Sequence, residues 1–179
     1  MFKLPFWDKK AKNQPSVKIV MGLGNPGVEH RQTYHNAGLL YIDAVAPGGF
    51  KQYKHFAFVR QGDMIFTKSL LFMNQSGQAV REALKYFGLE PQNLILAHDD
   101  SDLVLGKHKF SFGRGGAGHK GVASVINHLQ TKDFYRLRLG IRKRQGKAGD
   151  FVLKNLSATD RKLLEKTFAA ITLPDQSAR

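Results

Sequence analysis

The sequence predicts a single α/β domain in which a central, twisted, mixed β-sheet is flanked by helices. β-rich runs alternate along the chain with helical patterns, which is typical of α/β folds. The 179 residues, of which 42% are hydrophobic, are enough to build one domain with a real core. We find no internal repeat and no interdomain linker. We therefore expect one domain over residues 17–179, preceded by a polar, basic extension over residues 1–16.

Two glycines mark the ends of elements in the first half of the chain. Gln61-Gly62 lies between two β-rich runs and suits the tight turn of a hairpin. Gly88 follows an apolar helical face and stands where a C-terminal helix cap belongs. In chain order, the expected elements of this half are a strand over 16–23, a helix over 36–46, hairpin strands over 55–60 and 63–68, and a helix over 75–88.

The second half of the chain returns to β-rich runs and closes with a helix. A continuous apolar run ending at His98 predicts a buried strand, and two later runs alternate apolar and basic residues, as half-exposed strands do. Ser157 and Asp160 resemble a capping box at the start of the last helix. The expected elements of this half are strands over 93–98, 107–112 and 135–141 and a helix over 157–171.

Composition narrows the class of partner. The formal net charge is +14 and the sequence pI is near 10.1, which favours a polyanionic partner such as nucleic acid over a surface that is basic only for solubility. The absence of cysteine excludes disulfides, thiolate zinc sites and a cysteine nucleophile, and it fits a cytoplasmic protein. No apolar run approaches the roughly 20 residues that span a bilayer, so we expect no membrane association.

The first motif is the stretch GLGNPG, in which Gly22, Gly24 and Gly27 have the spacing of a dinucleotide-binding fingerprint. A fingerprint needs a helix to begin inside the motif, whereas here Pro26 and a polar stretch without helical periodicity intervene. Asp43 has about the offset of a ribose-binding acid, but it falls inside an expected helix rather than at a strand end. The glycines therefore favour a turn at the end of a strand.

Such a turn would direct Asn25 and the following polar loop into a cleft, because functional groups in open α/β sheets gather at the carboxyl ends of strands. The loop carries His35, whose side chain is suited to proton abstraction at neutral pH. His35 is thus a candidate general base. Taken alone, it could equally be a loop histidine with no special function.

A second polar group, Asp99, Asp100 and Asp102, follows the buried run that ends at His98, and we expect it at a strand end. Clustered carboxylates suit a divalent metal ion. One aspartate could instead accept a hydrogen bond from a catalytic histidine and set its tautomer. A solvated acidic loop is the third possibility, and spacing alone does not choose among the three.

A third motif is a glycine-rich loop over 113–121 that precedes a helical pattern. It departs from the P-loop because His119 stands where lysine is required and no serine or threonine follows Lys120. With Arg114, His119 and Lys120, the loop still suits phosphate through backbone amides and positive charge. The alternative is a mobile surface loop.

Taken together, these motifs resemble those of the bacterial peptidyl-tRNA hydrolase family. The resemblance covers nearly the whole chain from Val17 to about Ile171, and several motifs in order are far more specific than any single one. The stretches that carry it are GLGNPG with HNAG, FMNQSG, HDDSDL, GRGGAGHKG and RLRLGI.

The resemblance implies a monomeric α/β enzyme that uses no metal or cofactor and cleaves the ester between a peptide and the 3′ end of tRNA. It implies that His35 is the general base and that Asp99 holds and polarises it. Asn25 would bind the peptide end, and Asn74 would bind substrate or water near the scissile carbonyl, with Phe72 beside it. From the residues alone, Asn74 could simply be a helix-start residue.

The partner implied is peptidyl-tRNA, bound at its acceptor stem and CCA end. His30, His119, Lys120 and Arg138 are the expected substrate- and tRNA-binding residues. The basic residues that could follow the phosphates are Arg114, Lys120, Arg136, Arg138, Arg142, Lys143 and Arg144. The alternative for the run around 136–144 is an edge strand guarded by charge.

This chain also departs from the usual family pattern. His30 stands where the family usually has tyrosine, Tyr34 where arginine precedes the catalytic histidine, and Lys120 where asparagine is usual. The proposed base and its aspartate are both present, so we expect activity. An RNA-binding relative with weak or altered hydrolase activity is the alternative.

Overall fold

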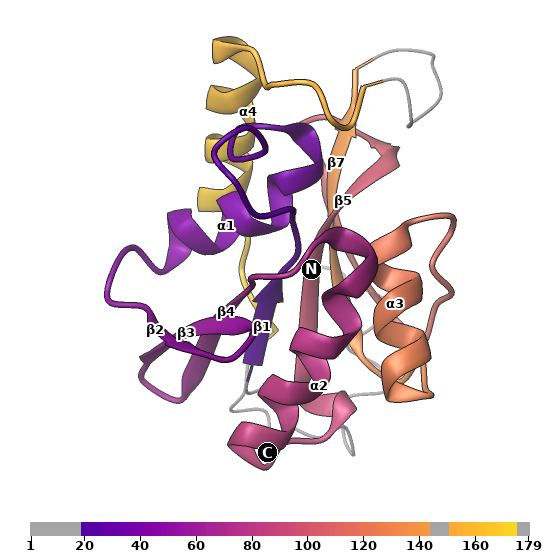
Figure 1. The fold of residues 1–179 in the computed structure, drawn as a ribbon. Coiled ribbons are helices and arrows are strands. Elements are labelled where there is room, and N and C mark those ends of the chain that lie inside the picture. Colours follow the sequence, from indigo (N-terminus) through magenta and orange to yellow (C-terminus); the bar gives the residue numbers. More distant parts are fainter. Residues whose placement is uncertain (1–18, 144–150, 175–179) are drawn as a thin grey trace, which may run out of the picture.

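The computed structural model describes residues 19–143 and 151–174, which form a mixed seven-stranded sheet between helices (Figure 1). The strand order is β2-β3-β4-β1-β5-β7-β6, with the inner strands β4, β1, β5 and β7 parallel to one another. The strands are β1 (Ile19–Gly22), β2 (Lys51–Tyr53), β3 (Phe56–Gln61), β4 (Met64–Ser69), β5 (Leu94–Val104), β6 (His108–Phe112) and β7 (Tyr135–Arg142). The expected α/β fold with a mixed sheet is confirmed, whereas the extension expected over residues 1–16 lies outside the described residues.

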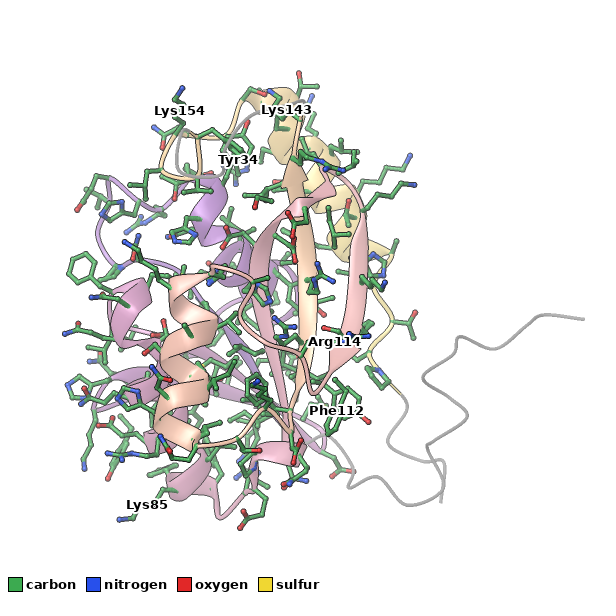
Figure 2. All side chains as sticks on the ribbon, turned by 90° about the vertical axis from the view of Figure 1, so that its right-hand side faces the viewer. Tyr34, Lys85, Phe112, Arg114, Lys143 and Lys154 are labelled. Atoms are coloured by element: carbon green, nitrogen blue, oxygen red, sulfur yellow. The ribbon has the colours of Figure 1, made fainter. Side chains whose placement is uncertain are left out.

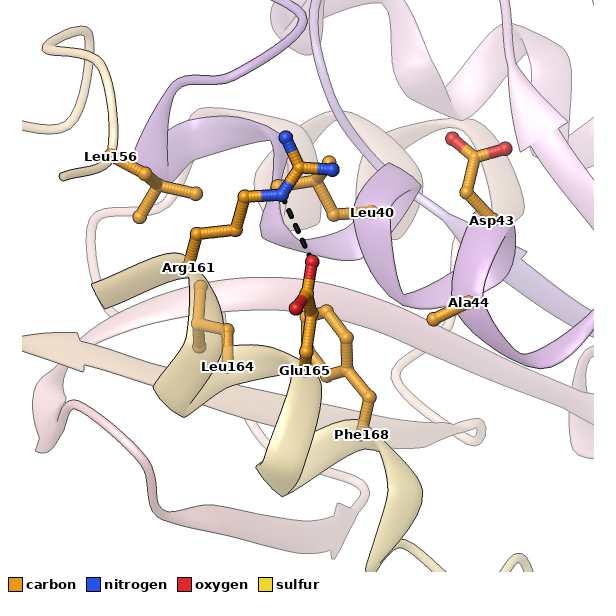
Figure 3. Close-up of a pocket in the computed structure, with 8 residues that line it drawn as sticks. All are labelled: Leu40, Asp43, Ala44, Leu156, Arg161, Leu164, Glu165 and Phe168. Carbon is orange, nitrogen blue, oxygen red and sulfur yellow. Dashed lines mark hydrogen bonds and ion pairs between the residues drawn. The ribbon is translucent and has the colours of Figure 1, made fainter. Parts of the chain in front are cut away.

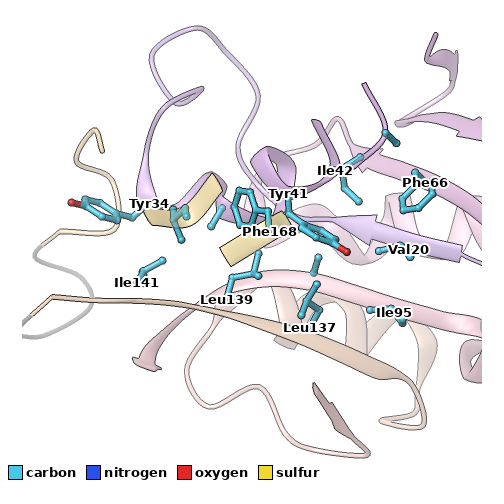
Figure 4. Packing of buried hydrophobic residues seen from close by; sticks show 14 of the residues in the cluster. Val20, Tyr34, Tyr41, Ile42, Phe66, Ile95, Leu137, Leu139, Ile141 and Phe168 are labelled. Carbon is cyan, nitrogen blue, oxygen red and sulfur yellow. The ribbon is translucent and has the colours of Figure 1, made fainter. Parts of the chain in front are cut away.

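Helices cover both faces of the sheet, because successive side chains of each strand point to opposite faces. Val20 packs with α1 and α4 in one core cluster (Figure 4), and Ile19 and Met21 pack with α2 and α3 in the other. The helices are α1 (Ala37–Val45), α2 (Ser76–Phe87), α3 (Lys120–Leu129) and α4 (Ala158–Ala169), with 3-10 turns η2 (Tyr34–Asn36), η3 (Met73–Gln75) and η4 (Pro91–Asn93). The described part of the chain contains no helix long and apolar enough to cross a membrane.

Several expected elements are confirmed. The hairpin forms by antiparallel pairing of β3 with β4, with Gly62 in its turn at φ +57°. Gly88 ends α2 in the left-handed conformation. Ser157 caps α4 by accepting from the backbone N–H of Asp160, but the Asp160 carboxylate binds elsewhere, so only half of the expected capping box is present.

One expected strand end is wrong, and so is the alternative of an edge strand around 136–144. β5 does not end at His98 but continues through the acidic residues to Val104, with a register irregularity between Asp100 and Val104. The carboxylates therefore lie within a strand rather than after it. β7 is not an edge strand, because it pairs with β5 on one side and β6 on the other, and β6 forms that edge of the sheet.

The GLGNPG glycines allow close packing between β1 and the segment that begins α1. A Cβ at Gly22 would lie 2.4 Å from the Gly38 carbonyl oxygen, and one at Gly24 would lie 2.6 Å from Leu39 Cδ1. The helix begins only at Ala37, outside the glycine motif. The motif therefore lacks the helix N-terminus on which a dinucleotide pyrophosphate would sit.

A shallow pocket lies between α1 and α4 (Figure 3). Apolar side chains of both helices form its wall, and Arg161 pairs with Glu165 at its rim at 2.9 Å. None of the candidate catalytic residues lines it. The candidate catalytic residues lie beyond the carboxyl end of β1 instead.

Candidate active site

Residues from four segments meet beyond the carboxyl end of β1. Asn25 follows β1, His35 lies in the 3-10 turn η2, Asp99 lies in β5, and His119 stands immediately before α3. The parallel pairing of β1 with β5 sets Gly22, the last residue of β1, opposite Ala97, so Asp99 in β5 lies just beyond the end of β1. The sequence-predicted catalytic residues His35 and Asp99 are in direct contact there.

The contact between His35 and Asp99 sets the chemical state of the imidazole. His35 Nδ1 lies 2.9 and 3.0 Å from the two carboxylate oxygens of Asp99. A carboxylate accepts, so Nδ1 carries the proton and Nε2 keeps a free lone pair. The His35 side chain is 15% exposed, whereas that of Asp99 is 4% exposed. The arrangement presents a basic nitrogen near the surface and shields the carboxylate that orients it.

His119 is the second partner of Asp99, and both of its ring nitrogens are engaged in hydrogen bonds. Its Nδ1 accepts hydrogen bonds from the backbone N–H groups of Gly121 and Val122 and so caps α3. This leaves the proton on Nε2, which donates to Asp99 Oδ1 at 2.8 Å. The sequence predicts that His119 binds substrate, and the structure shows that its ring also supports Asp99. Its position directly before a helical pattern was the available signal for a cap.

The acidity of Asp99 follows from these partners. Burial alone would raise the pKa of its carboxyl, but the electrostatic interaction and hydrogen bond with His119, together with the hydrogen bond from His35, outweigh burial and hold the pKa well below its usual range. Asp99 is therefore ionised at neutral pH. An ionised Asp99 is the state that keeps the proton of His35 on Nδ1.

His35, Asp99 and His119 also raise the question of a metal ion, because each offers a ligand atom within 4.8 Å of the others. A metal-bound histidine normally donates its other ring N–H to an acceptor. The other nitrogen of His119 faces two backbone donors, so it cannot carry that proton. The donor pattern thus suits a hydrogen-bonded cluster better than a resident metal. Of the other acidic residues, Asp100 pairs with Arg138, and Asp102 is exposed.

Asn25 is held so that only its amide nitrogen remains available. Its backbone N–H donates to Asn36 Oδ1 at 2.8 Å, and its carbonyl oxygen accepts from Asn36 Nδ2 at 2.9 Å. Its side-chain oxygen accepts from the backbone N–H of Met73 at 2.8 Å. No described residue is bonded to Asn25 Nδ2. The turn after β1 therefore presents a fixed hydrogen-bond donor.

The hydrogen bond from the Met73 N–H to Asn25 Oδ1 also ties this turn to η3, which Phe72 precedes and in which Asn74 lies. Phe72 is 50% exposed, and the ring of His30 meets it edge-on with centroids 6.3 Å apart. Asn74 is exposed and makes no side-chain cap for η3 or α2. An apolar ring and an exposed amide thus flank Met73, the residue that binds the side-chain oxygen of Asn25.

His98 is a further histidine of the cluster that the sequence did not single out. It is buried, and its Nδ1–H donates to the carbonyl oxygen of Asp99 at 2.7 Å. Burial lowers the pKa of His98 to about 3, so its ring is neutral. Its ring packs against that of His119 with centroids 4.8 Å apart, and its buried Nε2 has no partner among the described residues.

Comparison with known proteins assigns the chain to a family. The model of the peptidyl-tRNA hydrolase family matches residues 19–173. The chain belongs to the peptidyl-tRNA hydrolase family. Peptidyl-tRNA hydrolase of Neisseria gonorrhoeae is 38% identical over 169 residues, which cover 86% of each chain, and that of Mycoplasma capricolum is 36% identical over 162 residues, covering 85% of this chain and 87% of its own.

Solved structures of the family also share the fold. The crystal structure of peptidyl-tRNA hydrolase from Acinetobacter baumannii superposes with a TM-score of 0.77 at 26% sequence identity. The match covers 89% of this chain and 86% of that one. The seven-stranded sheet with its flanking helices is therefore the peptidyl-tRNA hydrolase fold.

This member of the peptidyl-tRNA hydrolase family carries a group of basic side chains over β6 and β7, beside α3 (Figure 2). Arg138 donates to Asp100 at 2.5 Å. Arg136 is only 4% exposed, and its side chain makes no hydrogen bond or ion pair within the described residues. Burial lowers the pKa of Arg136, and the positive charge of Arg138 acts in the same direction. Ser111, opposite Arg136 on β6, has a buried hydroxyl without a partner in the described part of the chain.

The remaining predicted binding residues are placed as follows. Lys120 is exposed at the first position of α3, and Arg142 is exposed at the end of β7. Lys143 follows β7 and donates to Asp160 at 2.6 Å, so its ammonium is already engaged. Arg144 lies outside the described residues.

Proposed function

We propose that the protein hydrolyses the ester bond between the peptide and the 3′ end of tRNA, with His35 as the general base. The observation that carries this proposal is the pairing of His35 Nδ1 with the buried Asp99 carboxylate, which leaves Nε2 free to accept a proton. Ester hydrolysis at neutral pH needs such a base, and a positioned one contributes roughly 10²–10⁴-fold. The family membership supports the same reaction.

The reaction needs only water as co-reactant. His35 Nε2 takes a proton as the water oxygen attacks the ester carbonyl carbon, and a tetrahedral oxyanion forms. The amide of Asn25, whose oxygen is already bonded to Met73, donates to that oxyanion, with Asn74 at the neighbouring turn as a second amide. The protonated His35 then returns its proton to the tRNA 3′ oxygen as the ester bond breaks. No step calls for a metal or an organic cofactor.

We propose that the acceptor stem lies along the basic side chains of β6 and β7, and that the CCA end reaches His35. A buried guanidinium without a carboxylate partner suits a phosphate oxygen, because a buried charge is stable only when paired. Arg136 is only 4% exposed as a residue and forms no ion pair with a described carboxylate, and Arg138 and Arg114 raise the positive charge around it. We further propose that the protein acts as a monomer in the cytoplasm, where translation supplies the substrate.

The catalytic proposal is tested with His35→Ala and an N-blocked aminoacyl-tRNA. We expect the rate of tRNA release to fall at least about 10²-fold. His128→Ala, which changes a histidine in the last turn of α3, is the matched control and should keep the wild-type rate. Equal release by wild type and His35→Ala, with RNA binding retained, would instead favour an RNA-binding relative with little hydrolase activity.

The tRNA surface is tested through salt dependence. Each lost phosphate contact should reduce the slope of log affinity against log salt by about 0.7–0.9. We expect this change in Arg138→Ala and Arg114→Ala. Lys85→Ala at the end of α2, at the lower edge of Figure 2, removes the same charge elsewhere and should leave the slope unchanged. Identical slopes in all variants would place the acceptor stem on another surface.

A further inference from the structure

The 3-10 turn that carries His35 is held by a segment far away in the sequence. The backbone N–H of His35 donates to the carbonyl oxygen of Val152 at 2.8 Å, and that of Tyr34 donates to Lys154 at 3.2 Å. The backbone N–H of Leu156 donates in turn to the carbonyl oxygen of Gln32 at 2.8 Å. The segment leading into α4 therefore pairs with the loop before the catalytic histidine.

The side chain of Tyr34 strengthens this attachment. Its hydroxyl donates to Asp160 Oδ2 at 2.5 Å, across 126 positions of sequence. Lys143 Nζ donates to the same oxygen at 2.6 Å. The Tyr34 ring meets Phe151 edge-on at 5.7 Å, and Figure 4 shows its hydroxyl turned away from the core cluster. One carboxylate on α4 thus joins the turn of His35 to the end of β7.

The ionisation states of Asp160, Lys143 and Tyr34 maintain these hydrogen bonds at neutral pH. The side chain of Asp160 is 7% exposed. Burial opposes its ionisation, but hydrogen bonds from Lys143, Tyr34 and Ser157 outweigh burial and lower its pKa to about 2. Burial and the Asp160 carboxylate both raise the pKa of Tyr34, so the phenol keeps its proton. The three groups remain carboxylate, ammonium and phenol throughout the neutral range.

Tyr34 and His35 are consecutive residues of a turn with about three residues per revolution, so their side chains leave it in different directions. Tyr34 reaches Asp160, and His35 reaches Asp99. We propose, on the basis of the function proposed above, that Tyr34, Asp160 and Lys143 are positioning residues that hold His35 in register with Asp99. Loss of the Tyr34 hydroxyl frees one side of the turn, and the His35 ring moves relative to Asp99.

A purely stabilising function explains this network less well. The ion pair of Asp160 with Lys143, whose side chain is 51% exposed, contributes little net stability because solvent screens such a pair. A directional network fixes geometry instead, and a displacement of about 1 Å at a catalytic group can lower the rate about 10²-fold. The position of the network, one residue from the proposed base, is where fixed geometry has most effect.

The test compares Tyr34→Phe with Tyr41→Phe. Tyr41 is an equally buried tyrosine, in α1, with its ring against Phe168 and no hydroxyl partner among the described residues. We expect Tyr34→Phe to lower kcat for N-blocked aminoacyl-tRNA about tenfold with little change in KM, and Tyr41→Phe to change neither. Asp160→Asn keeps an oxygen that can accept from Tyr34 but removes the negative charge that attracts Lys143. We therefore expect a smaller decrease in kcat for Asp160→Asn than for Tyr34→Phe.

The second readout is the ¹⁵N spectrum of the His35 ring, which does not depend on activity. We expect the Nδ1–H signal to broaden or shift in Tyr34→Phe and to stay unchanged in Tyr41→Phe. An unchanged His35 signal in folded Tyr34→Phe, or equal losses of kcat in both phenylalanine variants, would overturn the positioning function. Absence of hydrolysis by the wild type would refute the proposed reaction, while the spectrum would still decide whether the network holds His35.

Discussion

Two buried carboxylates hold consecutive residues of one 3-10 turn, and they differ in what they bind. Asp99, in β5, binds the imidazole of His35, and Asp160, in α4, binds the phenol of Tyr34. Both carboxyls have a lowered pKa despite burial. The same physical effect, hydrogen bonding that outweighs desolvation, therefore operates on both sides of the turn.

The two carboxylates differ in the groups that they bind. Asp160 has the permanent cation of Lys143 beside it, so its charge is compensated within the protein. Among the described residues, the Asp99 carboxylate has only the two imidazoles of His35 and His119 in hydrogen-bond contact, and no lysine or arginine is paired with it. Its negative charge is thus available to stabilise a positive charge that develops on His35. We therefore expect Asp99 to stabilise the charge on His35 and Asp160 to fix the position of the turn.

The largest expected effect comes from Asp99→Asn. The new amide can present N–H to His35 Nδ1, which moves the proton of the ring to Nε2 and removes the base. We expect kcat/KM for N-blocked aminoacyl-tRNA to fall about 10²–10⁴-fold, with tRNA binding kept. Asp160→Asn, the same change on the other side of the turn, should cost much less activity. Equal losses in the two variants would erase the distinction between the regions.

A smaller effect is expected from His119→Ala, which removes one partner of Asp99 and the cap of α3 together. Loss of a helix cap costs about 1 kcal/mol of unfolding free energy, and a less constrained Asp99 should lower kcat about tenfold. His119→Asn can restore the cap because asparagine is a good N-cap residue. If it recovers stability but not kcat, the contact with Asp99 is what catalysis requires. Recovery of both would make His119 a cap only.

The Asp99 region was largely predictable from sequence, and the Asp160 region was not. The glycine turn and the loop behind it indicated Asn25 and His35, because polar side chains after strands gather at one sheet edge. The contact of Tyr34 with Asp160 spans 126 positions and depends on where α4 packs, which no local pattern specifies. Only the start of α4 at Ser157 was visible in the sequence.

The strands also show that local sequence patterns do not specify long-range pairing. The hairpin of β3 and β4 was predictable from alternation and a Gly turn, which are local signals. β5 was expected to end at His98 because the residues that follow are acidic, yet it continues because β7 pairs with it through Asp100 and again at Val104. Likewise, the alternation of apolar and basic residues predicted that β7 is half-exposed. Arg136 is buried nonetheless, and β7 lies between β5 and β6. Tertiary pairing overrode local polarity in both cases.

The smallest expected effect is on the free energy of unfolding at acidic pH. It depends on Asp160 and not on Asp99. The pKa of Asp160 is lowered to about 2 from an ordinary value of 3.8, so its ionised form stabilises the fold above about pH 4, and this contribution is lost as pH falls toward 2. We expect Asp160→Asn to unfold about 1–2 kcal/mol more easily than wild type at pH 7 in urea titrations, with the difference shrinking between pH 4 and 2. Asp63→Asn, in the exposed hairpin turn, is the control and should follow wild type at each pH. A difference that stays constant from pH 7 to pH 2 would mean that the shape of the side chain, rather than its charge, holds Tyr34.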